Sequence, residues 1–295
     1  MIFNSNLLQL KREIKQLSEI ELWDNITNEN MKIWLRQFSS PEEILLGHLI
    51  ARNLIVRNNK QMTQLMLQAI RRAVTHFIKE EDRYRFNWQQ ILNDGYNSKT
   101  FFMGPVNFNI EGFEKPGKSG EIIMPLIKKF VPRSNFQYPD SYKDGLNAKE
   151  AFFLIDDAIL SGHQIEEWIN RYYKNLMTDS ESQSALVVGI AHEEALQYLR
   201  QELPSLKIFY GELLIKEYSF VNLCHKWCDS GIWPKDYPSP LEVFNAINER
   251  ANFKEKTPFG HLNQALLLAY SYGTPDNTIQ ILRDNSSNWE SLVSR

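Results

Sequence analysis

The clearest indication of the fold is the segment Ala151-Phe152-Phe153-Leu154-Ile155-Asp156-Asp157-Ala158-Ile159-Leu160-Ser161-Gly162-His163-Gln164. Its leading apolar run predicts a strand buried on both faces, and the Ser-Gly turn predicts a loop that opens a helix near His163. Strand, loop and helix in this order form the unit of a parallel α/β sheet. Because ligands bind outside the carboxyl ends of such strands, Asp156 and Asp157 are predicted to be site residues.

The turn after the two carboxylates suits an anion. Backbone N–H groups in a turn, and the positive end of the helix that follows, stabilise a bound phosphate group. The candidate phosphate-binding residues are Ser161, Gly162, His163 and Gln164. Carboxylates accept hydrogen bonds from sugar hydroxyls, so the sequence predicts a sugar-phosphate site.

This stretch resembles the signature of the type I phosphoribosyltransferases, which is an apolar strand, two acidic residues, two further residues and a Thr-Thr-Gly-x-Thr phosphate loop. Here the loop reads Leu160-Ser161-Gly162-His163-Gln164, so Leu160 and Gln164 replace hydroxyl residues. The resemblance implies a phosphoribosyl diphosphate or nucleotide ligand held with Mg²⁺. It also implies that Asp156 and Asp157 are catalytic and contact ribose hydroxyls or metal-bound waters. A strand, acidic residues and a Ser-Gly turn also occur in α/β proteins without this chemistry.

Three features resemble one branch, the phosphoribosyltransferase-like effectors of bacterial conflict systems. They are the Ser-Gly-x-Gln variant of the loop, the Gly-Thr-Pro-Asp-Asn-Thr segment at 273–278 and the Trp-containing tail from Trp289 to Arg295. Asp276 stands where the branch has Asn, and its Trp is here Arg283 or absent. Some members are encoded beside retron reverse transcriptases. The resemblance implies an anti-phage toxin and a complex with a reverse transcriptase and its RNA or msDNA through the N-terminal helical region.

A second loop precedes the acidic strand. Lys115-Pro116-Gly117-Lys118-Ser119-Gly120 lies between a predicted strand at 108–112 and an apolar segment at 122–130, which we expect to be helical despite Pro125. In the resembled fold this loop holds pyrophosphate, which makes Lys118, Ser119 and Gly120 the pyrophosphate-side candidates. The spacing does not fit a Walker A motif, and a surface turn explains the loop equally well.

The sequence changes character near residue 95, after which short apolar runs alternate with Gly and Pro. Before it, apolar residues recur at helical spacing, and Ser40-Pro41 predicts a helix start with Glu43 in its first turn. Apolar runs at 185–190 and 207–210 predict further strands, with a helix over 192–202. The chain therefore predicts a helical N-terminal region over 1–95 and a parallel-sheet, type I phosphoribosyltransferase-like α/β domain over 96–295.

Composition restricts the class of protein. The 295 residues carry a net charge of −3, which gives no global reason to expect nucleic-acid binding. A local basic excess over residues 51–85 predicts either a solvated helix face or a surface for an acidic partner. The start lacks a signal-peptide pattern, and we expect a cytoplasmic chain without membrane contact. Cys224 and Cys228 share a helical face, but no second Cys/His pair accompanies them, so a zinc site is not expected.

Three functions remain open from the sequence. The chain is either an enzyme that transfers or hydrolyses a phosphoribosyl or nucleotide N-glycosyl group, a catalytically inactive nucleotide sensor, or an adaptor with the same fold. The replacements Leu160 and Gln164 make the inactive alternatives credible.

Overall fold

The computed structural model describes residues 2–19, 23, 26–78, 87–93, 100–106, 119–137, 146, 150–177 and 183–293. The chain forms two compact units. The central unit spans 60–214, and the terminal unit combines 1–59 with 215–295. This division differs from the predicted boundary at residue 95, because the segment after the sheet folds with the N-terminal helices.

The central unit is built on a parallel sheet of four strands, in the order β2-β3-β4-β5. The strands are β2 (Thr100–Pro105), β3 (Glu150–Ile159), β4 (Ser184–His192) and β5 (Ile208–Leu214). The apolar runs of β3 and β4 are buried almost throughout, as strands covered on both faces require. The predicted parallel α/β class is confirmed.

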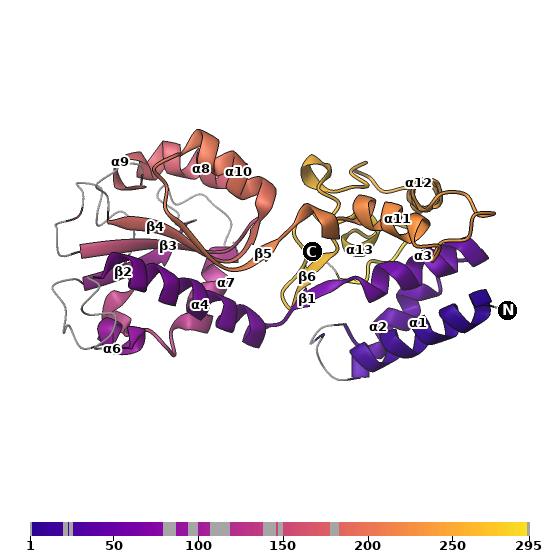
Figure 1. Cartoon of the computed structure of the whole chain (residues 1–295), viewed down its shortest axis with the longest axis horizontal. Coiled ribbons are helices and arrows are strands. Elements are labelled where there is room, and N and C mark those ends of the chain that lie inside the picture. Colours follow the sequence, from indigo (N-terminus) through magenta and orange to yellow (C-terminus); the bar gives the residue numbers. More distant parts are fainter. Residues whose placement is uncertain are drawn as a thin grey trace. The chain divides into compact units, whose positions relative to one another are not determined.

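Helices cover both faces of this sheet (Figure 1). They are α4 (Asn59–Phe77), α6 (Trp88–Asn93), α7 (Ser119–Ile127), α8 (His163–Trp168), α9 (Lys174–Met177) and α10 (Glu193–Glu202), with a 3-10 turn at Arg133–Asn135 and a π-helical turn at Ile169–Tyr173. On one face, Phe77 of α4 lies 5.8 Å, centroid to centroid, from Phe153 of β3. On the other, Leu199 of α10 packs in one buried cluster with Leu154. The segment at 108–112 lies outside the described residues.

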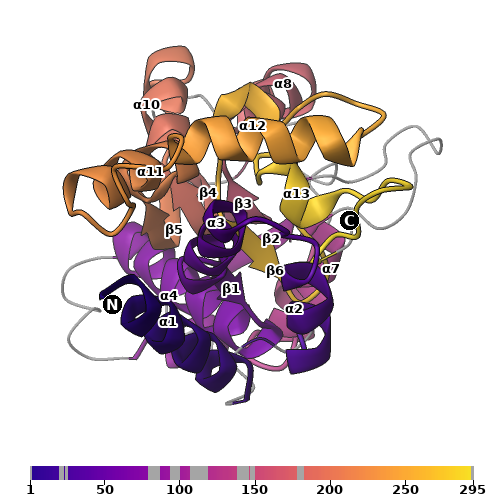
Figure 2. The same ribbon diagram turned by 90° about the vertical axis from the view of Figure 1, so that its right-hand side faces the viewer.

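The terminal unit joins both ends of the chain. Its elements are α1 (Ile2–Glu19), α2 (Asn28–Leu35), α3 (Pro41–Arg52), β1 (Ile55–Arg57), a 3-10 turn at Lys216–Tyr218, α11 (Phe220–Asp229), α12 (Pro240–Ala251), a 3-10 turn at His261–Asn263, β6 (Leu268–Tyr270) and α13 (Gln280–Arg283). β1 and β6 pair in parallel, so the predicted helical region also contains a short strand. α12 contacts both α3 and α11 (Figure 2).

Local signals explain how the helices of this unit begin. Ser40 caps α3 as predicted, its side chain accepting from the N–H of Glu43, with Pro41 in the first turn. Ser239 and Glu242 form a capping box at the start of α12. None of the described helices is long and apolar enough to cross a membrane.

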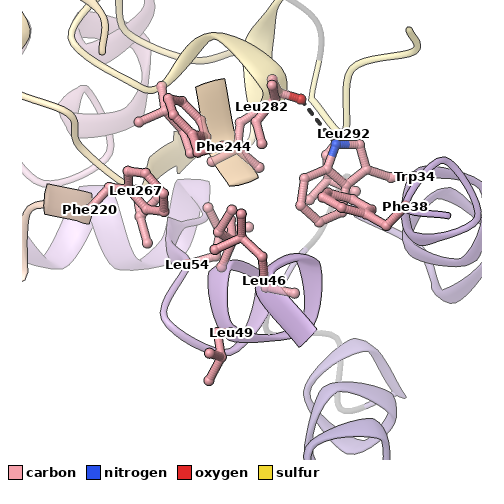
Figure 3. Close-up of a cluster of buried hydrophobic side chains, with 14 of the residues drawn as sticks. Trp34, Phe38, Leu46, Leu49, Leu54, Phe220, Phe244, Leu267, Leu282 and Leu292 are labelled. Carbon is pink, nitrogen blue, oxygen red and sulfur yellow. Dashed lines mark hydrogen bonds between the residues drawn. The ribbon is translucent and has the colours of Figure 1, made fainter. Parts of the chain in front are cut away.

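The core of the terminal unit draws on both ends of the sequence. Figure 3 shows Leu46 and Trp34, from the N-terminal helices, packed in one cluster with Phe244 and Leu282. These four side chains are at most 1% exposed. Burying a large apolar side chain contributes about 1.5–3 kcal/mol, so this shared core holds the two chain ends together.

Candidate functional site

The acidic pair lies where β3 extends beyond its neighbour β2. Within the described residues β2 ends at Pro105, which is in register with Ile155. β3 continues to Ile159, and Asp156 is in register with Val188 of β4. The carboxylates were predicted to follow the strand, but they lie within it because β4 continues to pair with β3. They occupy the predicted carboxyl-terminal part of the sheet, at a step between two strands.

The backbone is irregular at this acidic pair. Ile159 belongs to the same buried cluster as Phe152 and Leu154, so the strict alternation of side chains between faces is broken between Leu154 and Ile159. The N–H of Asp157 donates to Oδ1 of Asp156 over 2.9 Å, and the N–H of Ala158 donates to Oδ1 of Asp157 over 2.7 Å. Side-chain oxygens thus fix the local backbone.

Both carboxylates are buried, with Asp156 only 4% exposed and Asp157 only 6%. A buried carboxylate requires hydrogen-bond donors, metal or counter-charge, and the two backbone N–H groups supply part of that requirement. The pair is therefore held rigidly rather than projecting into solvent. Rigid carboxylates of this kind can orient hydroxyl groups or water molecules.

The loop after β3 contains the residues predicted to bind phosphate. Gly162 has φ of +86°, the left-handed region that glycine adopts without steric cost, and it precedes the first residue of α8. The N–H of Glu166 donates to the carbonyl of Gly162 over 2.9 Å, which starts the helix at the predicted position. Leu160 is buried, whereas Ser161 is half-buried. The loop thus has the turn and helix start expected of an anion cradle.

The side chains of the first turn of α8 have different surroundings. The ring of His163 stacks on Tyr198 of α10, with the centroids 4.2 Å apart and the planes at 19°. Glu166 accepts from the hydroxyl of Tyr198 over 3.4 Å, and burial together with this carboxylate raises the pKa of Tyr198. Gln164 is exposed. The His163 imidazole is thus engaged with α10, and its backbone N–H is the group suited to phosphate.

The predicted pyrophosphate loop is only partly described. Lys118 lies outside the described residues, and Ser119 and Gly120 begin α7, although their side chains are outside what the structure describes. α7 follows β2 along the chain and contacts both β2 and β3. A crossover helix runs back along the sheet, so its first residues lie near the carboxyl ends of the strands.

His192 lies at this edge of the sheet, although the sequence predicts it as the first residue of a helix. It is instead the last residue of β4, and its side chain caps α10. Ala191 is in register with Ile159, so His192 lies one residue beyond the last registered pair of β3 and β4, and it is in register with Leu214 of β5. A histidine directly after an apolar strand run, before Glu193-Glu194, was the signal that could have identified it.

The side chains near the carboxyl ends of the strands determine whether Mg²⁺ could be held there. No three His, Cys, Asp or Glu side chains gather closely enough to hold a metal ion in the part of the chain that the structure describes. Two buried carboxylates suit Mg²⁺, which keeps several waters and takes other ligands from substrate oxygens. Cys224, buried on α11, has a raised pKa because of its burial, and Cys228 is exposed, so neither forms a described metal cluster.

The segment at 274–278 has a structural role in the terminal unit. Asn277 donates to Oε1 of Gln264 over 2.7 Å, and the Thr278 hydroxyl donates to the carbonyl of Leu268 over 2.7 Å. Arg283, 3% exposed, donates from Nε to the carbonyl of Thr278 over 3.0 Å. These contacts brace the strand β6 and account for a segment whose role the sequence left undetermined.

Comparison with known proteins places the chain in a family. No curated protein matches it. The sequence profile of the PRTase-CE family matches residues 31–295, which takes in both the acidic pair of the central unit and the tail of the terminal unit. The chain therefore belongs to the PRTase-CE family of phosphoribosyltransferase-like effectors.

Proposed function

We propose that the central unit binds phosphoribosyl diphosphate or a nucleotide at the carboxyl ends of β2, β3 and β4. The observation that carries this proposal is the buried acidic pair, Asp156 and Asp157, in a strand whose following loop turns at Gly162 with φ of +86°. Groups for ribose hydroxyls and for a phosphate are thus adjacent along one strand and its loop. Membership in the PRTase-CE family supports the same ligand class.

The chemistry of the ligand suggests the role of each group. Breaking the bond at C1 of a phosphorylated ribose puts positive charge on the sugar and negative charge on the leaving group. In the proposal, Asp156 and Asp157 accept from the ribose hydroxyls or orient metal-bound waters, and residues 161–164 hold the 5-phosphate, chiefly through backbone N–H groups. Lys118, Ser119 and Gly120 are proposed to face the pyrophosphate. The reaction class is transfer or hydrolysis of the ribosyl group.

Mg²⁺ is the proposed cofactor. The two carboxylates would hold it through its bound waters, and when bound it would neutralise charge on the pyrophosphate. One oxygen of each carboxylate already accepts a backbone N–H, which favours such an indirect role over a tight protein cage.

A catalytically inactive sensor is the second candidate. Leu160 is buried and places an apolar side chain where a donor to phosphate is expected, and Gln164 is exposed on the first turn of α8. A site with these replacements can bind a nucleotide through its backbone and still fail to turn it over. Binding without turnover would favour this candidate.

The proposed biological role is that of a toxic effector in anti-phage defence, of the retron type. The effector character of the family supports this role. The partner that we propose is a complex of reverse transcriptase with RNA or msDNA. In the central unit, the exposed face of α4 suits an acidic partner, because α4 contains no Asp or Glu. Arg71 and Arg72 line a hollow of about 530 Å³ together with His76 and Phe209. Cations beside a partly exposed aromatic ring are groups suited to binding single-stranded nucleic acid.

Isothermal titration with phosphoribosyl diphosphate and Mg²⁺ tests the ligand. We expect saturable binding by the parent and loss of binding in the double variant Asp156→Asn, Asp157→Asn. If no heat of binding were measured at millimolar ligand, the enzyme and the nucleotide sensor would both be contradicted. The adaptor would then be the remaining candidate function.

Turnover is tested separately by mass spectrometry of nucleotide pools after expression. An enzyme depletes a nucleotide or phosphoribosyl diphosphate, and the double Asn variant does not. The effector role is tested by growth of cells that express each form. If the double variant were as toxic as the parent, the catalytic proposal would be wrong.

A further inference from the structure

Two glycines lie in the row of the sheet that contains Asp157. The registered pairs on either side place Asp157 of β3 opposite Gly189 of β4, and Gly189 opposite Gly211 of β5. A Cβ on Gly189 would lie 2.9 Å from Cε of Met62 in α4. One on Gly211 would lie 2.7 Å from the Cα of Leu65 in the same helix. A strand glycine permits the close approach of another element, so both glycines let α4 approach the sheet closely in the row of Asp157.

The alternation of side chains between the two faces shifts at this row in β4 as well as in β3. The buried cluster on the α10 face contains Leu154 and then Ile159 from β3, and Val188 and then Ala191 from β4. Residues separated by five or by three positions would lie on opposite faces of a regular strand. Both strands are therefore irregular at the same level of the sheet, and Gly189 lies inside the irregular part of β4.

The carbonyl of Asp157 occupies the space that a side chain at position 189 would need. A Cβ on Gly189 would lie 3.0 Å from this carbonyl oxygen, closer than side chains normally approach. The peptide between Asp157 and Ala158 is trans, and the C=O and N–H of a trans peptide point in opposite directions. The N–H of Ala158 therefore points away from Gly189, and it donates to Oδ1 of Asp157 over 2.7 Å. One peptide unit thus joins the space at Gly189 to the hydrogen bond on the carboxylate.

We propose that Gly189 is a positioning residue of this site. By leaving room for the Asp157 carbonyl on the α4 face, it sets the orientation of the peptide that follows Asp157 and hence the direction of the Asp157 carboxylate. Its role is indirect and acts through this peptide. The inference rests on the proposed function, because it explains how a carboxylate proposed to meet the ribose hydroxyls or metal-bound waters is held in place.

Gly189→Ala in the full chain tests the inference, with Gly211→Ala as the matched control. Each variant adds one methyl group in the same row on the α4 face. The methyl group at 189 meets the carbonyl of Asp157, whereas that at 211 meets the backbone of Leu65. The measurements are the Kd for phosphoribosyl diphosphate with Mg²⁺, the midpoint of urea unfolding and the amide resonance of Ala158 in NMR.

We expect Gly189→Ala to bind about tenfold more weakly and to shift the Ala158 amide resonance, because the hydrogen bond from that amide to a charged carboxylate is bent or lost. Gly211→Ala should lower the urea midpoint but keep the parent's affinity and the parent's Ala158 resonance. Three results would each overturn the inference: parent-like affinity of Gly189→Ala, an unchanged Ala158 resonance in that variant, or equal weakening of binding in both glycine variants.

A second variant separates the two close contacts of the added methyl group. Gly189→Ala combined with Met62→Leu removes the 2.9 Å contact to Cε of Met62 and leaves the 3.0 Å contact to Asp157. We expect its affinity to remain lowered. Recovery of the parent's affinity would show that the crowding acts through α4, and would overturn the inference. This double variant takes the place of Gly189→Ala if the single variant does not fold.

The same measurements keep the inference distinct from the proposed function. If the parent does not bind at millimolar ligand, the proposed function fails, and the Ala158 resonance still decides whether Gly189 orients this peptide. If the parent binds and the double Asn variant at 156 and 157 does not, the proposed function stands whatever the result for Gly189→Ala.

Discussion

The indole N–H groups of Trp34 and Trp289 donate to one carbonyl oxygen, that of Ile281, over 3.0 Å and 2.8 Å. The two rings meet edge to face, with centroids 6.5 Å apart. Trp34 belongs to α2 and Trp289 to the C-terminal tail, so a single buried acceptor joins the two ends of the chain. The shared bond is a structural reason for a tryptophan in the tail.

The shared acceptor predicts a stability coupling between the two tryptophans. Trp34→Phe or Trp289→Phe alone leaves the carbonyl of Ile281 with one donor, whereas the double variant leaves it buried without either. We expect the double variant to lose about 1–2 kcal/mol more than the sum of the single losses, measured by urea unfolding. Trp233, which donates to the carbonyl of Pro238 over 2.8 Å, is the control, because Trp233→Phe combined with Trp289→Phe should be additive.

The ion pair between Glu43 and Arg250 predicts a pH dependence of the terminal unit. Glu43 accepts from both terminal nitrogens of Arg250, over 2.5 Å and 2.9 Å, and from the N–H of Ser39 over 2.9 Å. Burial by itself would raise the pKa of Glu43, but these hydrogen bonds outweigh it and the pKa lies below its ordinary value of 4.5. The pair therefore stabilises the fold above about pH 4.5, and this contribution is lost as the pH falls through the lowered pKa.

The test compares the parent with Glu43→Gln by urea unfolding between pH 7 and pH 3. At pH 7 we expect the variant to be less stable by about 1–3 kcal/mol, because Arg250 loses its charged partner. The difference should shrink below pH 4.5 as Glu43 becomes protonated in the parent. Glu249→Gln, an exposed neighbour on α12, should show no such convergence. A difference that stays constant over the whole range would contradict the ion-pair account.

Much of the fold could be predicted because its signals are local. The Ser40 cap, the buried strand at 151–155 and the turn at Gly162 are each specified by a few adjacent residues. The division of the chain could not be predicted, because it depends on which distant apolar faces pack together. Nothing in the sequence around Trp34 or Trp289 indicates that these two side chains pack in the same core.

The candidate site, like the fold, could be predicted only where its signals are local in the sequence. The acidic pair was identified from its place after an apolar run, and the loop from its Ser-Gly turn. His192 was missed because a histidine before two glutamates is equally typical of a helix start, and only the pairing of β4 with β3 brings it to the sheet edge. Within the described residues β3 also continues beyond the end of β2 at Pro105, and the sequence could not predict this because the length of a strand depends on its neighbour.

Gly211 of β5 predicts how closely α4 approaches the sheet. A Cβ on Gly211 would lie 2.7 Å from the Cα of Leu65, a backbone atom of α4 that cannot move aside without displacing the helix. We expect Gly211→Ala to destabilise the protein by about 1–3 kcal/mol in urea unfolding, the range for overpacking a close contact. Gln197→Ala, which changes an exposed side chain of α10 on the opposite face of the sheet, is the control and should leave stability within about 0.5 kcal/mol of the parent.

Hydrogen exchange of the α4 amides measures where this destabilisation acts. If the close contact holds α4 on the sheet, Gly211→Ala should raise exchange rates in α4 more than in α10 on the opposite face. Equal stability of Gly211→Ala and the parent would show that α4 moves away at no cost, and would contradict the close packing.

Gly162 links the phosphate loop to α10, and its substitution tests whether that geometry matters for binding. Its φ of +86° is strained for any other residue, and an added Cβ would lie 3.0 Å from Cδ1 of Tyr198 and 3.1 Å from Cγ of Leu199. We expect Gly162→Ala to cost about 1–2 kcal/mol of stability and to weaken binding of phosphoribosyl diphosphate, because the first turn of α8 must shift. Glu167→Gln, which changes an exposed side chain of α8 outside residues 161–164, is the control. If Gly162→Ala were destabilised but bound the ligand as tightly as the parent, phosphate binding by the backbone of this loop would be wrong.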